Sequence, residues 1–198
     1  MSKIIAQGAE AILEQNNKVV IKNRIIKTYR IKEIDEKLRK QRTKIEIKIL
    51  KKASEIIDVP KVIMGNDFSI EMEFISGDKL SEKLDKYNLK KQLKVMAILG
   101  KELTKLHNEN IIHGDLTTSN MILKKEKLFI IDFGLSFISR RVEDKAVDLH
   151  LIKQALEAKH FKNWEKLFDS FISSYKPIEK EKILLQLKKV ESRGRYKH

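Results

Sequence analysis

Two short stretches, HGDLTTSN at residues 113–120 and IIDFG at residues 130–134, decide how this sequence is interpreted. Asn120 lies five positions after Asp115, and Asp132 lies twelve positions after Asn120. Phosphoryl transfer needs one carboxylate that orients or deprotonates the acceptor. It also needs hard oxygen ligands that hold magnesium against the nucleotide phosphates. We therefore predict that Asp115 takes the first role and that Asn120 and Asp132 take the second.

Each of these residues also has a purely structural interpretation. Asp115 could cap a turn, Asn120 could begin a strand, and an Asp-Phe-Gly triplet also occurs by chance. The joint arrangement favours the catalytic interpretation, because the apolar runs Met121–Leu123 and Leu128–Ile131 flank the cluster as predicted strands. The order and spacing resemble the catalytic and metal-binding loops of the protein-kinase superfamily.

That resemblance implies an ATP-anchoring lysine on the third strand of the N-terminal half and a glutamate on the helix that follows. The run Val19–Lys22 supplies the lysine, although Lys22 alone could be a solubility lysine on an edge strand. We select Glu46 as its partner. Lys22 would place a charge on the phosphates, and Glu46 would fix its orientation. Three other glutamates lie in or beside the same predicted helix: Glu33, Glu36 and Glu55.

The first 75 residues predict elements in the order β-β-β-α-β-β. Short β-prone runs bounded by turn residues predict strands at Ile4–Gln7, Ala11–Glu14, Val19–Lys22, Lys61–Met64 and Phe68–Phe74. The near-helical spacing of Leu38, Ile45, Ile49 and Ala53 predicts an amphipathic helix from about Ile34 to Ile57. A turn at Gly65-Asn66-Asp67 predicts a hairpin.

The chain becomes mainly helical after a break at Ile75-Ser76-Gly77-Asp78. An apolar stripe at spacings of three and four predicts a helix that ends near His107: Leu89, Leu93, Met96, Leu99, Leu103 and Leu106. Helical periodicity continues from Asp144 to about Val190, broken once at Pro177. We therefore predict an α+β, minimal two-lobed protein-kinase-like fold. Residues 1–75 would form a β-rich N-lobe with a five-stranded sheet and one long helix, and residues 76–198 a mainly helical C-lobe.

The resemblance becomes closer when six motifs are taken together: QGAEA at 7–11, VIK at 20–22, KTYR at 27–30, HGDLTTSN at 113–120, IDFGLSF at 131–137 and EDKAVDL at 143–149. In this order they resemble the small kinase-like ATPase subunit of the KEOPS complex, a family related to the RIO kinases. The resemblance implies that the chain binds ATP and Mg²⁺ and can phosphorylate serine or threonine. It also implies a role, through ATP hydrolysis, in forming threonylcarbamoyladenosine on tRNA. The implied partners are KEOPS subunits, chiefly the threonylcarbamoyl-transferring subunit, to which some archaea fuse this domain, and tRNA through the complex.

The kinase resemblance also implies a nucleotide site. The turn Gly8-Ala9-Glu10 would cover the phosphates, Met72 would lie at the back of the adenine pocket, and Glu73-Phe74-Ile75 would form the hinge that meets the base. The turn has one glycine where protein kinases have G-x-G-x-x-G, so we expect it to be tighter.

Two further departures from protein kinases concern the acceptor. Thr117 stands where many serine/threonine kinases have a lysine that steadies the transferred phosphate. About ten residues separate Gly134 from Asp144, with no A-P-E sequence, which is too few for a usual activation segment. Hydrolysis, with Asp115 orienting a water, therefore fits at least as well as protein phosphorylation.

Other polar residues have open assignments. Asp148 either accepts backbone hydrogen bonds from the catalytic loop or is a surface acid, and we expect His113 to brace that loop. The other histidines show no metal-ligand grouping. Basic residues in the tail, Arg193, Arg195 and Lys197, surround an aromatic Tyr196 and suit an RNA backbone, although a disordered end needs no function.

Composition narrows the class of protein without deciding it. The net charge of +14, from 42 Lys+Arg and 28 Asp+Glu, fits either a solvated Lys/Glu surface or a nucleic-acid partner. The absence of cysteine excludes disulfides, a Cys nucleophile and thiolate-bound metals. With no long apolar run, we expect a cytoplasmic protein that does not span a membrane. A regulatory serine/threonine kinase and a tRNA-binding pseudo-enzyme scaffold remain as alternatives to the ATPase.

Overall fold

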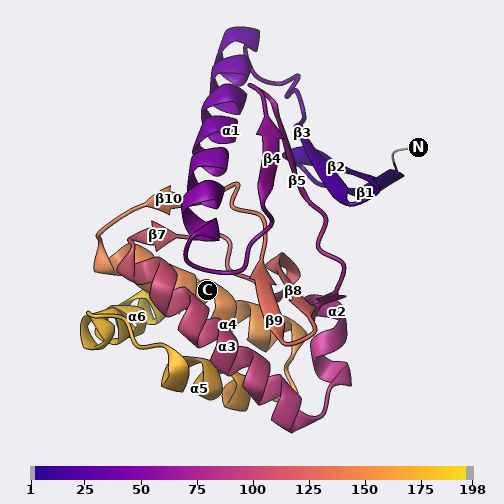
Figure 1. Cartoon of the computed structure of the whole chain (residues 1–198). Coiled ribbons are helices and arrows are strands. Elements are labelled where there is room, and N and C mark those ends of the chain that lie inside the picture. The colour runs from indigo at the N-terminus through magenta and orange to yellow at the C-terminus, as the bar shows by residue number, and fades with distance from the viewer. Residues whose placement is uncertain (1–2, 195–198) are drawn as a thin grey trace.

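A five-stranded antiparallel sheet and one long helix make up the first part of the chain, in a computed structural model that describes residues 3–194 (Figure 1). The sheet has the order β1-β2-β3-β5-β4. Its strands are β1 (Lys3–Gln7), β2 (Ala11–Asn16), β3 (Val19–Arg24), β4 (Val62–Gly65) and β5 (Ser69–Glu73). The helix α1 (Lys32–Ser54) lies between β3 and β4 in sequence and runs alongside the sheet. We call residues 3–73 the sheet region.

Tight turns set the register of the sheet. Ala9 and Glu10 form the tip of the β1–β2 hairpin, which a hydrogen bond from Gly8 N to Ala11 O closes at 3.0 Å. In the β4–β5 hairpin, the Asn66 side chain accepts hydrogen bonds from the backbone N–H groups of Phe68 and Ser69, both at 2.8 Å. This is the local side-chain bonding that makes asparagine a turn residue. All five predicted strands are present, with ends shifted by one or two residues.

The buried face of α1 is more polar than the sequence pattern predicted. Ile45, which the pattern placed on the apolar face, is 39% exposed, whereas Asp35, Thr43 and Glu46 are buried. The prediction was wrong about this face. Polar side chains can be buried there because each has a charged or hydrogen-bonding partner on β3 or on α1 itself. Only the last turns of the helix, which include Leu50, join an apolar core.

The second part of the chain, residues 78–194, is mainly helical and is called the helical region. It begins with β6 (Asp78–Lys79), α2 (Leu80–Lys83), η1 (Leu84–Lys86), α3 (Leu89–Asn108) and β7 (Ile111–Ile112). It continues with η2 (Thr118–Asn120), β8 (Met121–Lys124), β9 (Lys127–Ile130), β10 (Phe137–Ile138), α4 (Val142–Lys159), α5 (Trp164–Ser174) and α6 (Lys180–Gly194). Two small sheets, β6-β8-β9 and β10-β7, lie between the helices and the sheet region.

Helix α3 is the centre of the helical region and packs closely against α5. Asn88 directly precedes the helix, and its side chain caps it by accepting a hydrogen bond from Lys91 N at 2.9 Å. A Cβ added at Gly100 would lie 2.4 Å from the Phe171 carbonyl oxygen, so only glycine allows the two helices this approach. The buried leucines of α3 belong to one apolar cluster that extends from the end of α1 to α6.

The expectation of one helix break after Asp144 was wrong, because there are two. The break at Pro177 lies between α5 and α6, and a second separates α4 from α5 at residues 160–163. His160 ends α4 with its side chain buried against Asp85 and Thr118, a contact with no local sequence signal. The described helices include none that is long and apolar enough to cross a membrane.

Candidate active site

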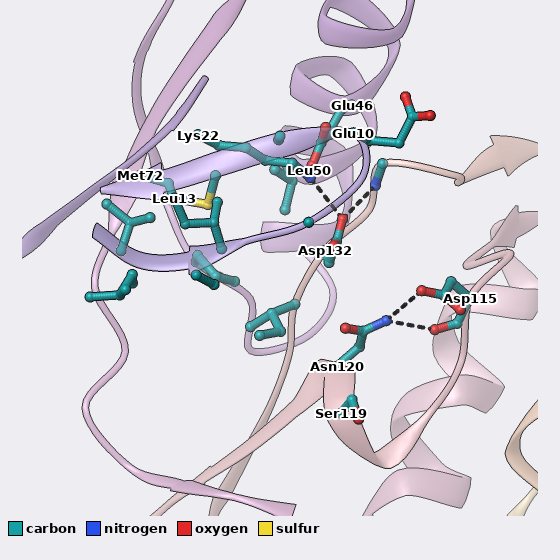
Figure 2. Close-up of a pocket in the computed structure, with 18 of the residues that line it drawn as sticks. Glu10, Leu13, Lys22, Glu46, Leu50, Met72, Asp115, Ser119, Asn120 and Asp132 are labelled. Atoms are coloured by element: carbon teal, nitrogen blue, oxygen red, sulfur yellow. Dashed lines mark hydrogen bonds and ion pairs between the residues drawn. The ribbon is translucent and has the colours of Figure 1, made fainter. Parts of the chain in front are cut away.

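A cavity of about 430 Å³ opens between the sheet region and the loops around β8 and β9 (Figure 2). Every residue that the sequence analysis assigned to catalysis, nucleotide binding or metal binding within residues 3–194, apart from the basic tail, lines it: Gly8, Ala9, Glu10, Lys22, Glu46, Met72, Glu73, Ile75, Asp115, Asn120 and Asp132. Residues more than 100 positions apart in the sequence therefore share one cavity. Their roles in binding and catalysis stay predictions.

Lys22 connects the sheet region to Asp132, in the segment 132–134 that was predicted to bind metal, across this cavity. Its Nζ lies 2.6 Å from Glu46 Oε1 on α1 and 2.7 Å from Asp132 Oδ1 after β9. Burial alone would lower the pKa of Lys22, but the two carboxylates outweigh it and raise that pKa above the ordinary value. Burial would likewise raise the pKa of Asp132, and the charge of Lys22 lowers it instead. At neutral pH Lys22 and Asp132 are therefore both charged.

Arg24 is a second buried cation on Glu46 that the sequence analysis missed. Its Nη2 lies 2.5 Å from Glu46 Oε2, and its Nε donates to Thr43 Oγ1 at 3.1 Å. Lys22 and Arg24 lie on the same face of β3, since side chains alternate along a strand. That alternation was a signal that could have placed Arg24 beside Lys22. Glu46 is thus fixed by two cations from one strand.

In the predicted catalytic loop, residues 113–120, Asp115 and Asn120 are hydrogen-bonded to each other. Asn120 Nδ2 donates to the backbone oxygen of Asp115 at 2.9 Å and to its Oδ2 at 2.8 Å. Figure 2 shows that this leaves the amide oxygen of Asn120 on the side away from Asp115. The short 3₁₀ turn η2 supplies the geometry, because it ends at Asn120 directly before β8.

The donor set of Asn120 and Asp132 fits a magnesium ion. Asp132 Oδ1 accepts from Lys22 and, at 3.2 Å, from Gly134 N, which leaves Oδ2 for another partner. An amide oxygen and a carboxylate oxygen are the hard ligands that Mg²⁺ takes, together with water and phosphate oxygens. Asp132 holds a left-handed backbone with φ 62°, a conformation that costs a non-glycine residue about 1–2 kcal/mol.

Asp148 accepts backbone hydrogen bonds from the catalytic loop, which confirms that interpretation over a surface acid. The side chain is fully buried, and its oxygens accept hydrogen bonds from His113 N at 2.7 Å and Gly114 N at 2.8 Å. Gly114 has φ 78°, and a Cβ there would lie 2.5 Å from Leu135 O, so the loop requires glycine at this point. The loop backbone before Asp115 is therefore fixed by one carboxylate.

His107 and Tyr175 extend this support into the helical core. His107 Nε2 lies 3.2 Å from Asp148 Oδ2, and its Nδ1 lies 2.6 Å from the Tyr175 hydroxyl. An ionised carboxylate only accepts, so Nε2 carries the proton and Nδ1 accepts from Tyr175. Burial lowers the pKa of His107, so the ring is neutral at pH 7. Neither residue was assigned from the sequence, since their contact depends on the fold.

His113 braces the loop, as expected. Its Nε2 lies 3.1 Å from the carbonyl oxygen of Ile131, and its Nδ1 accepts from Asp115 N at 3.2 Å. The ring thereby joins the segment before Asp115 to the segment before Asp132. Among residues 3–194 no group of three or more His, Asp or Glu side chains could hold a metal ion without further ligands.

The apolar end of the cavity lies against β5. Met72 is 8% exposed and packs with Val20, and Leu13 lies beside them. The backbone beyond Met72 is held in place because Glu73 N donates to Lys61 O at 2.9 Å and Phe74 N to Lys18 O at 2.8 Å. An apolar end of the cavity beside a fixed backbone suits an aromatic base.

Of the three basic tail residues, Arg193 is described by the structure, and it is not among the residues that line the cavity. Arg193 is exposed in the last turn of α6, and its Nη1 lies 2.7 Å from Glu143 Oε1 at the start of α4. It is therefore a helical residue. Arg195 and Lys197 lie outside the described residues.

Comparison with known proteins places this architecture in a family. A model of the RIO domain matches residues 10–149. The KEOPS complex subunit Bud32 of Pyrococcus abyssi is 42% identical over 98% of this chain and 96% of its own length. A probable serine/threonine-protein kinase BUD32 homolog of Archaeoglobus fulgidus is 39% identical over 96% of this chain and 94% of its own. A probable bifunctional tRNA threonylcarbamoyladenosine biosynthesis protein of Methanobrevibacter smithii is 42% identical, and 98% of this chain matches 37% of that protein.

A solved structure supports the fold class. The streptomycin–ATP–APH(2")-IIa ternary complex matches 99% of this chain and 83% of its own with a TM-score of 0.65 and 14% identity. At that identity the likeness concerns the fold alone, and it confirms the α+β, kinase-like fold class. The RIO-domain match and the nearly full-length similarity to two Bud32 proteins show that this chain belongs to the Bud32 family, a branch of the RIO-domain proteins.

Proposed function

We propose that the chain is a Mg-ATP-dependent kinase-like ATPase, capable of serine/threonine autophosphorylation, that acts in the KEOPS complex to support threonylcarbamoyladenosine formation on tRNA. One observation carries the catalytic half of this proposal: Lys22, Asp115, Asn120 and Asp132 line a single cavity with an apolar slot at its other end. The names of the relatives carry the biological half, since they include a KEOPS subunit and a tRNA threonylcarbamoyladenosine biosynthesis protein.

The proposal assigns a role to each of the charged and polar residues at the centre of the site. Lys22 binds the nucleotide phosphates, and Glu46 and Arg24 hold its position. Asn120 and Asp132 hold magnesium, which when bound neutralises charge that develops on the phosphates. Asp115 orients the acceptor and takes its proton, within a geometry that Asn120 fixes. The base lies against Met72, and Glu73 and Ile75 meet it through their backbone.

Hydrolysis is favoured over transfer to a protein by the segment after the metal loop. Residues 135–141 contain only the short strand β10, which pairs with β7, and α4 begins at Val142. Ser136 is buried, with its hydroxyl donating to the His113 carbonyl oxygen at 2.8 Å. This segment is thus tied to the catalytic loop and has little length with which to hold a peptide. Water is therefore the expected acceptor.

The proposed partners are KEOPS subunits, chiefly the threonylcarbamoyl-transferring subunit, with tRNA bound by the complex. Both a free-standing subunit and a longer bifunctional protein are among the relatives that match nearly all of this chain. We place the protein in the cytoplasm and treat residues 1–75 and 76–198 as its two lobes. Arg193, Arg195 and Lys197 are proposed to add backbone affinity for tRNA.

The proposal is tested by Asp132→Ala in a reconstituted complex with tRNA. ATP hydrolysis and protein labelling are measured side by side, with and without the partner subunits. We expect Asp132→Ala to abolish ATP turnover and tRNA modification, whereas Asp169→Ala, an exposed acid on α5, leaves both unchanged. Undiminished modification by Asp132→Ala would refute the catalytic role.

The alternatives predict different results in the same experiment. A regulatory serine/threonine kinase would label a partner protein at a rate comparable to the release of free phosphate. A pseudo-enzyme scaffold would fail to bind ATP at millimolar magnesium and would still bind tRNA.

A further inference from the structure

The tip of the β1–β2 hairpin is tied to the rest of the sheet region at three points. Ile25 N donates to the Glu10 carbonyl oxygen at 3.1 Å, and Lys27 Nζ donates to the Ala9 carbonyl oxygen. The third contact is an ion pair between side chains, with Arg42 Nη1 of α1 2.6 Å from Glu10 Oε2. Glu10 and Arg42 both line the cavity, as do Lys22 and Asp132.

Helix α1 carries a second contact to the cavity one turn further along. Glu46 follows Arg42 by four residues, so both side chains point to the same side of the helix. Glu46 holds Lys22, and Arg24 fixes Glu46 and Thr43 on the same helix. Because α1 is thereby attached to β3, any group attached to Arg42 is attached indirectly to the proposed catalytic lysine.

We propose that the Glu10–Arg42 ion pair is a latch that holds the phosphate-facing turn to α1. Glu10 and Arg42 are thus positioning residues, because they act through the turn and through α1. The turn and Lys22 then form one unit, so bound nucleotide leaves only when the latch opens. This inference rests on the proposed nucleotide-binding function and adds the element that governs nucleotide release. It also explains how a turn with a single glycine can cover phosphates.

The exposure of the pair sets the size of the expected effect. The Arg42 and Glu10 side chains are 35% and 46% exposed, so water screens part of their attraction. Ion pairs of this kind contribute little, equivalent to a change of about two- to fivefold in an equilibrium constant. The latch is therefore weak enough to open during turnover and strong enough to change a release rate measurably.

Three variants test the latch: Glu10→Gln, Arg42→Gln, and the exchanged pair Glu10→Arg with Arg42→Glu. We expect each single variant to speed dissociation of a fluorescent ADP analogue with magnesium about two- to fivefold. Amide hydrogen exchange at residues 8–11 of the nucleotide-free protein should rise by a similar factor. The exchanged pair should restore both quantities toward wild type. Lys94→Gln is the control, because Lys94 pairs with Glu126 on an exposed surface outside the cavity lining.

Several results would overturn the inference. If Glu10→Gln slows ADP release while Arg42→Gln speeds it, Arg42 binds phosphate directly and Glu10 only competes for it. If hydrogen exchange at residues 8–11 is the same in all variants, the pair does not hold the turn. If the wild type binds ADP and the variants release it at the wild-type rate, the latch fails and the proposed function stands. If the wild type itself does not bind ADP, both fail.

Discussion

The sheet region and the helical region are held together by different interactions. Around β3 the apolar cluster is small, with Val20, Ile70 and Met72, and buried ion pairs join β3 to Glu46 of α1. The helical region has a large apolar cluster that runs through α3, α4, α5 and α6. Its buried polar network, from Asp148 through His107 to Tyr175, contains a single charge that backbone and side-chain donors satisfy.

The difference between the regions indicates which side chains contribute mainly to stability and which mainly to activity. Buried ion pairs stabilise little compared with apolar packing, but removing one partner leaves an uncompensated charge. In the sheet region the paired charges line the cavity, so these side chains position the groups that are proposed to bind nucleotide. In the helical region the network contacts the catalytic loop through Asp148, which accepts hydrogen bonds from the loop backbone. Substitutions in the two regions should therefore affect stability and turnover in different proportions.

The largest effect is expected from Glu46→Gln, which leaves Lys22 and Arg24 without a shared carboxylate. The Lys22 and Arg24 side chains are 9% and 4% exposed. Lys22 keeps Asp132 as a partner, but Arg24 becomes an uncompensated buried charge, which costs about 3–5 kcal/mol. Urea denaturation of the variant would measure the loss in the free energy of unfolding. Glu126→Gln, on an exposed turn, serves as the control and should lose less than about 1 kcal/mol. A similar loss in both variants would remove the distinction between buried and exposed charge.

The next effect is expected from Lys22→Met and concerns turnover. ATP hydrolysis should fall about 10²- to 10³-fold, as happens when a group that stabilises transition-state charge is removed. Because Arg24 keeps the Glu46 carboxylate paired, the variant should lose less stability than Glu46→Gln. Steady-state hydrolysis and urea denaturation of the same preparation give both numbers. If Lys22→Met were the less stable of the two variants, the positioning role of the ion network would be wrong.

A smaller effect is expected from Tyr175→Phe in the helical region. The change removes the hydroxyl that donates to His107 Nδ1 and leaves this buried nitrogen without a donor, at a cost of about 1–3 kcal/mol. The Michaelis constant for ATP should not change, since Tyr175 is outside the cavity lining. Tyr29→Phe is the matched control, because that side chain is 75% exposed. A changed Michaelis constant with unchanged stability would contradict the assignment of Tyr175 to support of the fold.

The smallest effect is the pH dependence that His107 contributes. Its pKa is lowered by burial in the folded protein and returns to about 6.5 on unfolding. Between those two values the unfolded chain binds more protons, so the free energy of unfolding falls as pH is lowered from 6.5. The contribution is at most about 1.4 kcal/mol per pH unit. Comparing wild type with His107→Gln between pH 7 and 5 would measure it, and equal slopes would contradict it.

Much of the site could be predicted because its residues follow elements with strong local signals. Lys22 lies on a strand with a clear β pattern, and Asp115 and Asp132 flank two short apolar runs. The order of strands and helices in the sheet region followed from turns such as the one at Asn66. These features depend on neighbours in sequence, which is why a pattern could indicate them.

What could not be predicted depends on contacts between distant residues. Strand alternation indicates that Arg24 lies beside Lys22, but the pairing of Arg24 with Glu46 and of Arg42 with Glu10 depends on the position of α1 beside the sheet. The break at residues 160–163 lacks proline and glycine, and the His160 side chain there contacts Asp85 and Thr118. The strands β7 and β10 have two residues each and gain their pairing only from the fold around the catalytic loop.

The central claim, that the cavity is a Mg-ATP site, is tested most directly by calorimetric titration of ATP into the wild type and Asp132→Asn, with and without millimolar magnesium. The account predicts that the wild type binds one ATP per chain and binds it more tightly with magnesium. It also predicts that Asp132→Asn loses most of this dependence on magnesium. An absence of binding by the wild type, or an equal effect of magnesium on both proteins, would contradict it.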